Sequence, residues 1–186
     1  MTAWTEHLAR MGATLDETAR SIAFASPADE ARATETATIA VPLLHLGTIR
    51  SQGPDSAAFL HNLVSNDVKH MEADTAAWNS FNSPKGRMIA SFLVWTEEGG
   101  HALALSADIL PAFLKKFSMY VLRSKVKLAD ASAEVALIGL AGPQAVAIAQ
   151  AAGAALPAED MRQAVSAAGV RCIRLGAQRL VLAIAS

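Results

Sequence analysis

The sequence predicts an α+β fold built from two related small sheet-plus-helix units, of which the second is incomplete. Apolar residues make up 52% and charged residues 18% of the 186-residue chain, a balance typical of globular proteins. Segments with the period of strands alternate with amphipathic helical segments. The order strand, Gly-Pro turn, helix occurs twice, in residues 46–60 and 134–152, at an offset of 89 positions (142 minus 53). A chance echo is the alternative, because Gly-Pro pairs are common at turns.

Residues 1–40 are expected to form an N-terminal helix and a connector. Apolar residues at helical spacing predict a first helix that ends near Gly12, and residues 20–25 could be a short strand. Ser26, followed by Pro and then an acidic residue, is a typical helix start. The polar, Thr-rich residues 31–38 are interpreted as the connector.

The first α+β unit is expected over residues 41–130. A polar Glu-Glu-Gly-Gly turn between two apolar runs is a strong hairpin signal. Pro111 fits the first turn of a helix, where a missing N–H costs little. The expected elements are strands at 46–52, 75–82 and 125–128, a hairpin of 87–95 with 101–106, and helices at 56–64 and 109–121.

The partial second unit is expected over residues 131–186. It begins with a strand, a Gly-Pro turn and a helix, as the first unit does. No helix follows the apolar strand that ends the chain, so we expect this unit to be unfinished. The expected elements are a strand at 134–140, helices at 145–152 and 159–168, and a hairpin of 170–175 with 179–185.

Charge and cysteine content exclude several classes of protein. The net charge of −1 and the pI near 6.5 provide no basic excess, so we expect no direct binding of nucleic acid. The single Cys172 rules out an internal disulfide and fits a reducing compartment. No signal peptide and no membrane-spanning apolar run are recognised, so the sequence predicts a cytoplasmic protein without membrane contact.

Four motifs in order resemble the YgfZ branch of the glycine-cleavage T-protein (aminomethyltransferase) superfamily, over residues 41–186. They are the strand and Gly-Pro-Asp turn that lead through Phe59-Leu60 to the Asn66-Asp67 pair, the Lys85-Gly86-Arg87-Met88 turn, the helix-to-strand junction at 120–126, and the start of the second unit at 139–145. The resemblance implies a T-protein folate-binding fold and tetrahydrofolate as the cofactor. It also implies a link to iron–sulfur enzymes and to tRNA modification.

Two departures from the family pattern bear on activity. The T-protein proper has an acidic pair in the strand after the Lys-Gly turn, whereas this chain has Ala90 and Ser91. A hydroxyl cannot replace a carboxylate as a proton acceptor or as a partner for a cation, which argues against aminomethyl transfer. The Lys-Gly-Cys signature that lies beyond the second unit in YgfZ-type proteins is also missing. Either the chain is a fragment or it is a degenerate member of the family. We expect a fragment, because the second unit is also unfinished, and we expect it to bind folate weakly or not at all.

The candidate ligand-binding residues are polar groups near the family motifs. A basic turn could hold the anionic tail of folate, although a plain tight turn explains the same residues. Asn79 and Asn82 could bond the edge of a heterocycle stacked on Phe81, or Phe81 could simply be buried while the two amides are solvated. We assign no catalytic residue and no metal ligand. The cofactor-binding candidates are Asn66, Asp67, Asn82, Lys85, Gly86, Arg87 and Ser91.

Three functions stay open on the sequence alone. The first is a folate-binding accessory protein that supports the maintenance or assembly of iron–sulfur enzymes and tRNA modification. The second is a tetrahydrofolate-dependent aminomethyltransferase, and the third is a non-catalytic interaction module that uses the basic surface between Lys115 and Lys127. Folate and iron–sulfur proteins are the expected partners.

Overall fold

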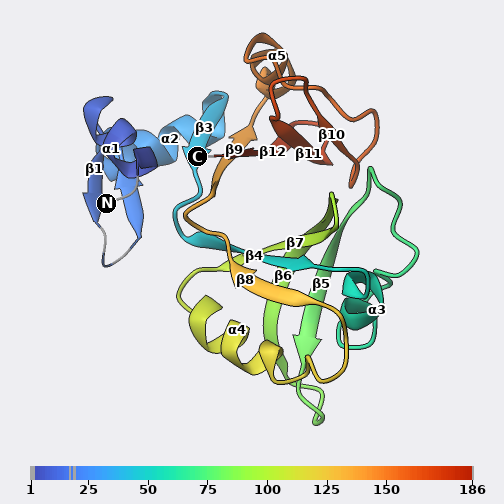
Figure 1. Cartoon of the computed structure of the whole chain (residues 1–186). Coiled ribbons are helices and arrows are strands. Elements are labelled where there is room, and N and C mark those ends of the chain that lie inside the picture. The colour runs from blue at the N-terminus through green and yellow to red at the C-terminus, as the bar shows by residue number, and fades with distance from the viewer. Residues whose placement is uncertain (1–2, 17, 19, 186) are drawn as a thin grey trace. The chain divides into compact units, whose positions relative to one another are not determined.

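The structure is a computed structural model that describes residues 3–16, 18 and 20–185. The chain forms two compact units. We call Leu46–Ser132 the middle unit, and we call Met1–His45 together with Ala133–Ser186 the split unit (Figure 1). No helix in the described residues is long and apolar enough to cross a bilayer. The expected division into an N-terminal region at 1–40, a first α+β unit at 41–130 and a partial second unit at 131–186 stays a prediction.

The middle unit contains one antiparallel five-stranded sheet in the order β5-β6-β7-β4-β8. Helix α3 connects the first two strands of this unit along the chain, and α4 follows the hairpin of β6 and β7 (Figure 1). The bounds are β4 Leu46–Gln52, α3 Ser56–His61, β5 Ala76–Asn82, β6 Met88–Glu97, β7 Gly100–Ser106, α4 Leu110–Ser118 and β8 Lys127–Asp130. Each predicted element of this unit is present, with ends that differ by a few residues.

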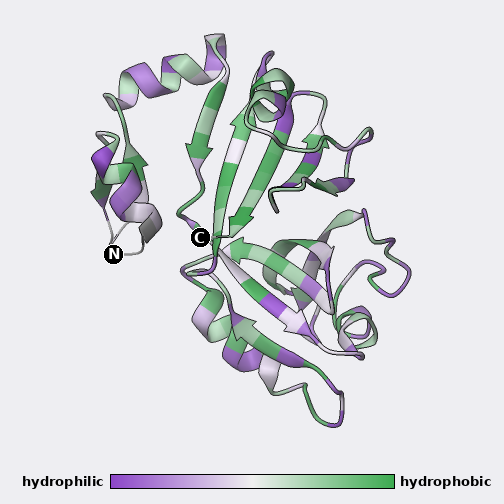
Figure 2. Ribbon diagram, turned by 45° about the horizontal axis from the view of Figure 1, so that its top comes forward, coloured by the Kyte–Doolittle hydropathy of each residue, from purple (hydrophilic) through white to green (hydrophobic). Residues whose placement is uncertain are grey.

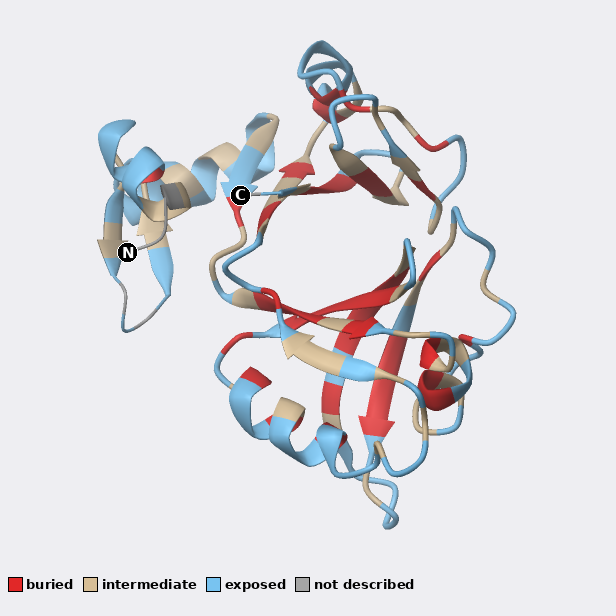
Figure 3. Cartoon of the chain, viewed as in Figure 1, coloured by how far each residue is buried: buried red, intermediate tan, exposed pale blue. Residues whose placement is uncertain are grey.

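Aromatic side chains fill the space between this sheet and its helices. Phe113 and Phe117 of α4 are buried and lie with their ring centroids 4.9 Å apart. Phe81 of β5 meets both rings edge to face, at 5.7 and 5.4 Å. The side of α4 that carries Lys115 and Lys116 is exposed, as the pale outer surface of this helix shows (Figure 3). The helix is therefore held by its apolar face, as its sequence predicts.

The split unit contains a second antiparallel five-stranded sheet, in the order β10-β11-β12-β9-β3. Helix α5 packs on it through the buried Ala145 and Ala149, and the strands are mostly apolar (Figure 2). The bounds are β3 Ile39–Pro42, β9 Val135–Ala141, α5 Ala145–Ala151, β10 Gln163–Val165, β11 Arg171–Gly176 and β12 Arg179–Ala185.

The two sheets share one topology, with one strand of the second supplied from elsewhere in the chain. Strands β4, β5, β6 and β7 take the same places as β9, β10, β11 and β12. The fifth place is held by β8 in the middle unit and by β3 in the split unit. Residues 39–40 were expected in the N-terminal region and residues 41–42 in the first unit, but residues 39–42 pair antiparallel with β9. The second sheet thus reaches five strands although no further element follows β12 within the described residues.

The turns after β4 and β9 also resemble each other in backbone conformation and in the close approach of another segment. Gly53 and Gly142 have φ angles of +131° and +122°, a region that side chains rarely adopt. A Cβ on Gly53 would lie 2.2 Å from the carbonyl oxygen of Lys125, just before β8. A Cβ on Gly142 would lie 2.7 Å from the Cα of Thr38, just before β3. In both units, glycine lets the segment leading to the fifth strand cross the turn closely.

The N-terminal region contains more regular structure than the sequence indicates. Helix α1 Ala3–Arg10 is followed by the strands β1 Thr14–Asp16 and β2 Ser21–Ala23, and then by α2 Pro27–Thr36. Ser26 caps α2 as predicted, since its side chain accepts a hydrogen bond from the Asp29 N–H at 3.2 Å. The connector expected at 31–38 is wrong, because residues 31–36 continue this helix. Helix α2 has no buried residue, so the cap and its Ala and Glu content sustain it.

The helix expected at 159–168 is also wrong. Residues 163–165 form strand β10, which pairs antiparallel with β11. Met161 has a φ of +59°, which interrupts any helix, and Gly169 closes a turn with the N–H of Val170 bonded to Ser166 Oγ. Pairing with a neighbouring strand therefore overrides the local preference of an Ala- and Glu-containing segment.

Candidate functional site

The β5 edge of the middle sheet gathers several of the predicted residues. Residues 64–66, which follow α3, run alongside β5 through a bridge between Val64 and Phe81. The Asn66 N–H donates to Asn79 Oδ1 at 2.7 Å, and Asn66 Nδ2 donates to the carbonyl of Trp78 at 2.6 Å. Asn66 therefore holds its segment against β5, while its side chain stays at the surface.

One face of β5 and β6 carries a group of polar residues beside an exposed aromatic ring. Successive residues of a strand point to opposite faces, so Trp78 and Ser80 of β5 share one face. The register shifts between Phe81 and Asn82, and the bond of the Asn82 side chain to Ser80 places it on the same face. Ser91 of β6 lies directly opposite Ser80. Asn82 Nδ2 donates to Ser80 Oγ at 3.3 Å, and the Trp78 side chain is 55% exposed. We call these four residues, Trp78, Ser80, Asn82 and Ser91, the polar face.

Trp78 was not among the sequence candidates, although it could have been recognised. It alternates with Ser80 and Asn82 in a strand whose other face is expected to be apolar. An aromatic ring on the polar side of such a strand needs a reason, because large apolar side chains normally turn toward the core. The polar face unites an aromatic surface with side chains that both donate and accept hydrogen bonds, which suits a flat polar heterocycle.

Phe81 and Asn79 lie on the opposite face of β5, toward the helices. Phe81 is 4% exposed and packs in the aromatic core, so it offers no stacking surface to a ligand. Asn79 is also buried, and its Nδ2 has no hydrogen-bond partner within the described residues. The sequence alternative of a buried Phe81 is confirmed, but the expectation of a solvated Asn79 is not.

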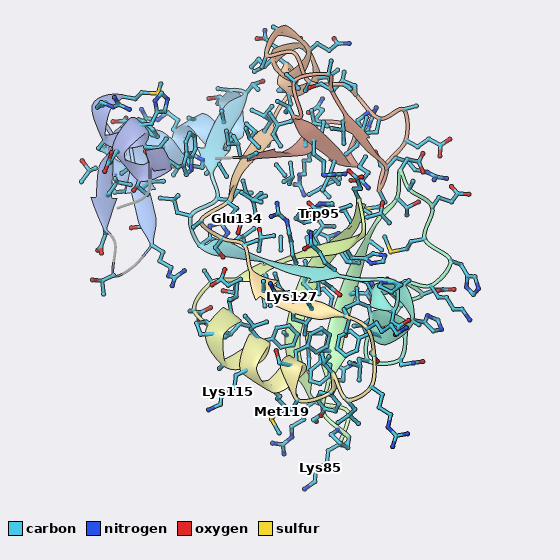
Figure 4. All side chains as sticks on the ribbon, in the orientation of Figure 1. Lys85, Trp95, Lys115, Met119, Lys127 and Glu134 are labelled. Carbon is cyan, nitrogen blue, oxygen red and sulfur yellow. The ribbon has the colours of Figure 1, made fainter. Side chains whose placement is uncertain are left out.

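Lys85, Gly86 and Arg87 form the exposed turn between β5 and β6, and Lys85 extends away from the sheet (Figure 4). Gly86 has a φ of +75°, as a tight turn requires. The Gly86 N–H donates to the Ser83 carbonyl at 2.8 Å, and the Arg87 N–H donates to Ser83 Oγ at 3.1 Å. Since both N–H groups are used inside the turn, the two basic side chains are what this turn offers to an anion.

Asp67 is directed toward two histidines of its own region. Its carboxylate lies 2.7 Å from His70 Nδ1 and 3.1 Å from His61 Nδ1. The side-chain hydrogen bond with His70, followed by the bond from its backbone N–H, lowers the pKa of Asp67 below its usual value. All three side chains are at least partly exposed, and the described residues contain no cluster of three or more groups suited to a metal ion.

Ala90 and Ser91 differ in their surroundings although they are neighbours. Ala90 points into the apolar core beside Phe81, whereas Ser91 is exposed on the polar face. A carboxylate at position 90 would be desolvated in this core, while one at position 91 would face the same side as Trp78. Neither position carries an acid, so this part of the site can bind through hydrogen bonds but holds no carboxylate base.

Cys172 lies in β11 and has the properties of a core residue. It is fully buried against Leu140, Leu180 and Leu182. Burial raises the pKa of its thiol to about 11, so the nucleophilic thiolate is scarce at neutral pH. Cys172 is thus unsuited to cluster binding or nucleophilic catalysis in the folded chain.

Comparison with known proteins supports the resemblance drawn from the motifs. The GCVT N-terminal domain family matches residues 3–180. The iron–sulfur cluster assembly factor IBA57 homolog, mitochondrial, of Mycosarcoma maydis is 35% identical over 106 residues, covering 48% of this chain and 26% of that protein. The tRNA-modifying protein YgfZ of Vibrio vulnificus strain YJ016 is 30% identical over 108 residues, covering 58% of this chain and 33% of that protein. The chain thus matches a third or less of the length of either relative.

A solved structure confirms the fold. The glycine cleavage system aminomethyltransferase T from Bartonella henselae superposes with a TM-score of 0.78 over 96% of this chain and 52% of that chain, at 17% identity. The predicted α+β class and T-protein fold are therefore correct. With the family match spanning nearly all of its length, the chain belongs to the GCVT N-terminal domain family, within the T-protein superfamily that its motifs resemble.

Proposed function

We propose that this chain is a folate-binding accessory protein that supports iron–sulfur enzymes and tRNA modification without catalysing aminomethyl transfer. The names of two relatives support this accessory role, since one is an iron–sulfur cluster assembly factor and the other is a tRNA-modifying protein. The observation that carries the proposal is the pair Ala90 and Ser91. Polar side chains lie beside Ser91 on the sheet, Ala90 points into the core, and no carboxylate stands at either position.

The polar face fits one part of a folate molecule, namely its flat heterocycle. Trp78 supplies an exposed ring for stacking, and Asn82 and Ser91 supply donors and acceptors beside it. The basic side chains of Lys85 and Arg87 at the adjoining turn would attract the glutamate tail. Tetrahydrofolate would supply the one-carbon chemistry where a partner enzyme uses it, and the residues here would only bind and orient it.

Titration with 5-formyltetrahydrofolate, followed by NMR shifts of the chain, tests the binding. We expect a Kd weaker than about 10 µM, with the largest shifts on β5 and β6. Replacing Trp78→Ala should weaken binding about tenfold, because stacking of an aromatic ring on a base contributes roughly 1–3 kcal/mol. Leu122→Ala is the matched control, since Leu122 is 85% exposed in the same unit. Shifts centred elsewhere, or equal binding by both variants, would refute the polar face as the folate site.

The aminomethyltransferase alternative is favoured by the fold of the Bartonella henselae protein, which bears that name. It predicts formation of methylene-tetrahydrofolate from an aminomethyl-loaded carrier protein. We expect no turnover above the uncatalysed rate, because Ser91 cannot accept a proton as a carboxylate does. Turnover that is lost in Ser91→Ala would replace the accessory role with the enzymatic one.

A further inference from the structure

A second polar cluster lies on the opposite side of the middle sheet, buried at the start of α3. It consists of Ser51 in β4, Ser56 in α3 and His101 in β7, and we call it the serine–histidine cluster. Ser56 Oγ lies 2.8 Å from Ser51 Oγ and 2.9 Å from His101 Nδ1. The exposed fractions are 0% for Ser51, 1% for Ser56 and 6% for His101. His101 shares its strand face with the core residues Leu103 and Leu105, so this cluster is separate from the polar face.

The hydrogen bonds of the cluster leave two arrangements for the imidazole nitrogens, because Ser56 Oγ has one proton and lies 2.8 Å from the Ser51 carbonyl and 2.9 Å from His101 Nδ1. We assign this proton to the Ser51 carbonyl, which can only accept. In this arrangement Ser56 accepts from His101, so Nδ1 carries a proton and donates it to Ser56. In the neutral ring, Nε2 then has a free lone pair. Within the described residues, Nε2 has no hydrogen-bond partner.

The other sheet shows that the fold does not need this cluster. At the offset of 89 residues that relates β4 to β9, Ser51 corresponds to Leu140 and Ser56 to Ala145. His101, the second residue of β7, corresponds to Leu180, the second residue of β12. Leu140, Ala145 and Leu180 are buried together in the core of the split unit. A site that can be filled by apolar side chains holds a polar cluster here, although burying polar groups costs free energy.

A surface groove of about 580 Å³ leads to His101 and Ser56. Its walls are mainly apolar and include Val68, Met71 and Ala57. The loop on its far side is fastened by Thr96 Oγ1, which donates to the carbonyl of Ala73 at 2.5 Å. The groove is therefore bounded on one side by the sheet and on the other by a loop that is hydrogen-bonded to strand β6 of that sheet.

Two charged residues line this groove, and they differ in availability. Glu97 is engaged by Arg50 Nε at 3.1 Å and by Trp95 Nε1 at 3.1 Å. Lys69 is exposed and forms no ion pair within the described residues. The groove thus presents a hydrogen-bond acceptor at its base, apolar walls, and one cation at its rim.

We propose that this groove binds a small organic acid that carries a hydroxyl or N–H donor. The donor would bond His101 Nε2, the carboxylate would pair with Lys69, and the apolar body would contact Val68 and Met71. The serine–histidine cluster would position the ring, since Ser56 holds Nδ1. This site is independent of folate binding, because it uses the other face of the sheet.

4-Hydroxyphenylacetate is a suitable probe, with phenylacetate as the matched acid that lacks the hydroxyl. Binding is followed by the ¹⁵N shifts of the His101 ring. We expect the hydroxylated acid to bind about three- to tenfold more tightly, the contribution of one net hydrogen bond. Lys69→Ala, a surface change that leaves the core intact, should weaken both acids by about two- to fivefold. Equal affinity for the two acids, or no effect of Lys69→Ala, would overturn the proposal.

The split unit also suggests a variant that separates binding from folding. The triple replacement Ser51→Leu, Ser56→Ala and His101→Leu copies the apolar set of the other sheet. We expect it to fold with a Tm no lower than that of the unchanged chain and to lose all preference for the hydroxylated acid. If the triple variant retains that preference, or if its Tm falls by more than about 5 °C, the cluster serves the fold and the proposal fails.

Discussion

Gly53→Ala tests the close crossing that shapes the middle unit. The replacement places a side chain at φ +131°, which costs about 1–3 kcal/mol of strain. The new Cβ would also lie 2.2 Å from the Lys125 carbonyl oxygen, so the backbone before β8 must move. That backbone is bonded to Asp55, whose Oδ2 accepts from the Lys125 N–H at 2.6 Å and whose N–H donates to the Lys125 carbonyl at 3.4 Å.

Loss of these two hydrogen bonds adds about 2–4 kcal/mol, since one of them involves a carboxylate. We therefore expect the free energy of unfolding of the middle unit to fall by roughly 3–7 kcal/mol. Gly86→Ala is the matched control. Gly86 also has a positive φ, of +75°, but a Cβ on this residue would meet no other atom within 4 Å, so only about 1–2 kcal/mol should be lost.

Urea unfolding followed by tryptophan fluorescence measures the difference. In a Trp4→Phe background, the two remaining tryptophans, Trp78 and Trp95, both lie in the middle unit. With an m-value of about 2 kcal/mol/M, Gly53→Ala should lower the midpoint by about 1.5–3.5 M and Gly86→Ala by about 1 M or less. Equal midpoints for the two variants would show that the clash with Lys125 is relieved without cost, and the reasoning would fail.

Three further predictions concern titration, reactivity and charge. Burial lowers the pKa of His101 below 6.5, so as the pH falls the unfolded chain binds a proton before the folded chain does. The free energy of unfolding should therefore be constant above about pH 7.5, fall as the pH drops below 6.5 and level off below the folded pKa. Urea midpoints measured over this pH range should lose the His101 contribution in His101→Leu. Cys172, fully buried with its pKa raised to about 11, should react with a disulfide reagent at pH 8 at a rate that tracks urea unfolding; fast reaction in the folded chain would contradict its burial. Binding of RNA, measured between 50 and 200 mM salt, should be weak and should not change when Lys115, Lys116 and Lys127 are reversed to Glu; a steep salt dependence lost on reversal would instead support the interaction module.

Local signals in the sequence predicted most of the middle unit and the start of α2 in the split unit. The Gly99-Gly100 turn of the hairpin and the Ser26-Pro27 start of α2 act over a few residues, and the structure has both. Strand β10 was not predicted, because its conformation depends on pairing with β11. The repeat could have predicted it, since β5 lies between α3 and β6 in the same way that β10 lies between α5 and β11.

The place of β3 could not be read from local patterns. Residues 39–42 pair with residues 138–141, about a hundred positions away, and nothing near them in the sequence specifies that partner. The candidate site was limited for a related reason. Asn66 and Ser91 were identified through motifs, but Trp78 and the link between Ser56 and His101 depend on which strand faces and neighbours the fold brings together.

The two sheets offer an internal comparison that separates residues needed by the fold from residues kept for chemistry. Gly53 and Gly142 are identical because both turns require a positive φ and a close crossing. Asp55 and Gln144 are at equivalent positions and differ, yet each forms a hydrogen bond with the segment before the fifth strand. The Asp55 carboxylate accepts from the Lys125 N–H, and the Gln144 N–H donates to Thr38 Oγ1 at 2.9 Å.

His101 and Leu180 follow neither pattern. Their positions in the two sheets are equivalent, their burial is equal within a few per cent, and their chemistry is opposite. Leu180 satisfies the requirements of packing, so packing alone gives no reason for a buried imidazole with a free nitrogen. A surface groove lies at the polar copy, where Lys69 adds a cation. A ligand that needs both an acceptor and a cation would account for this difference between two equivalent buried positions.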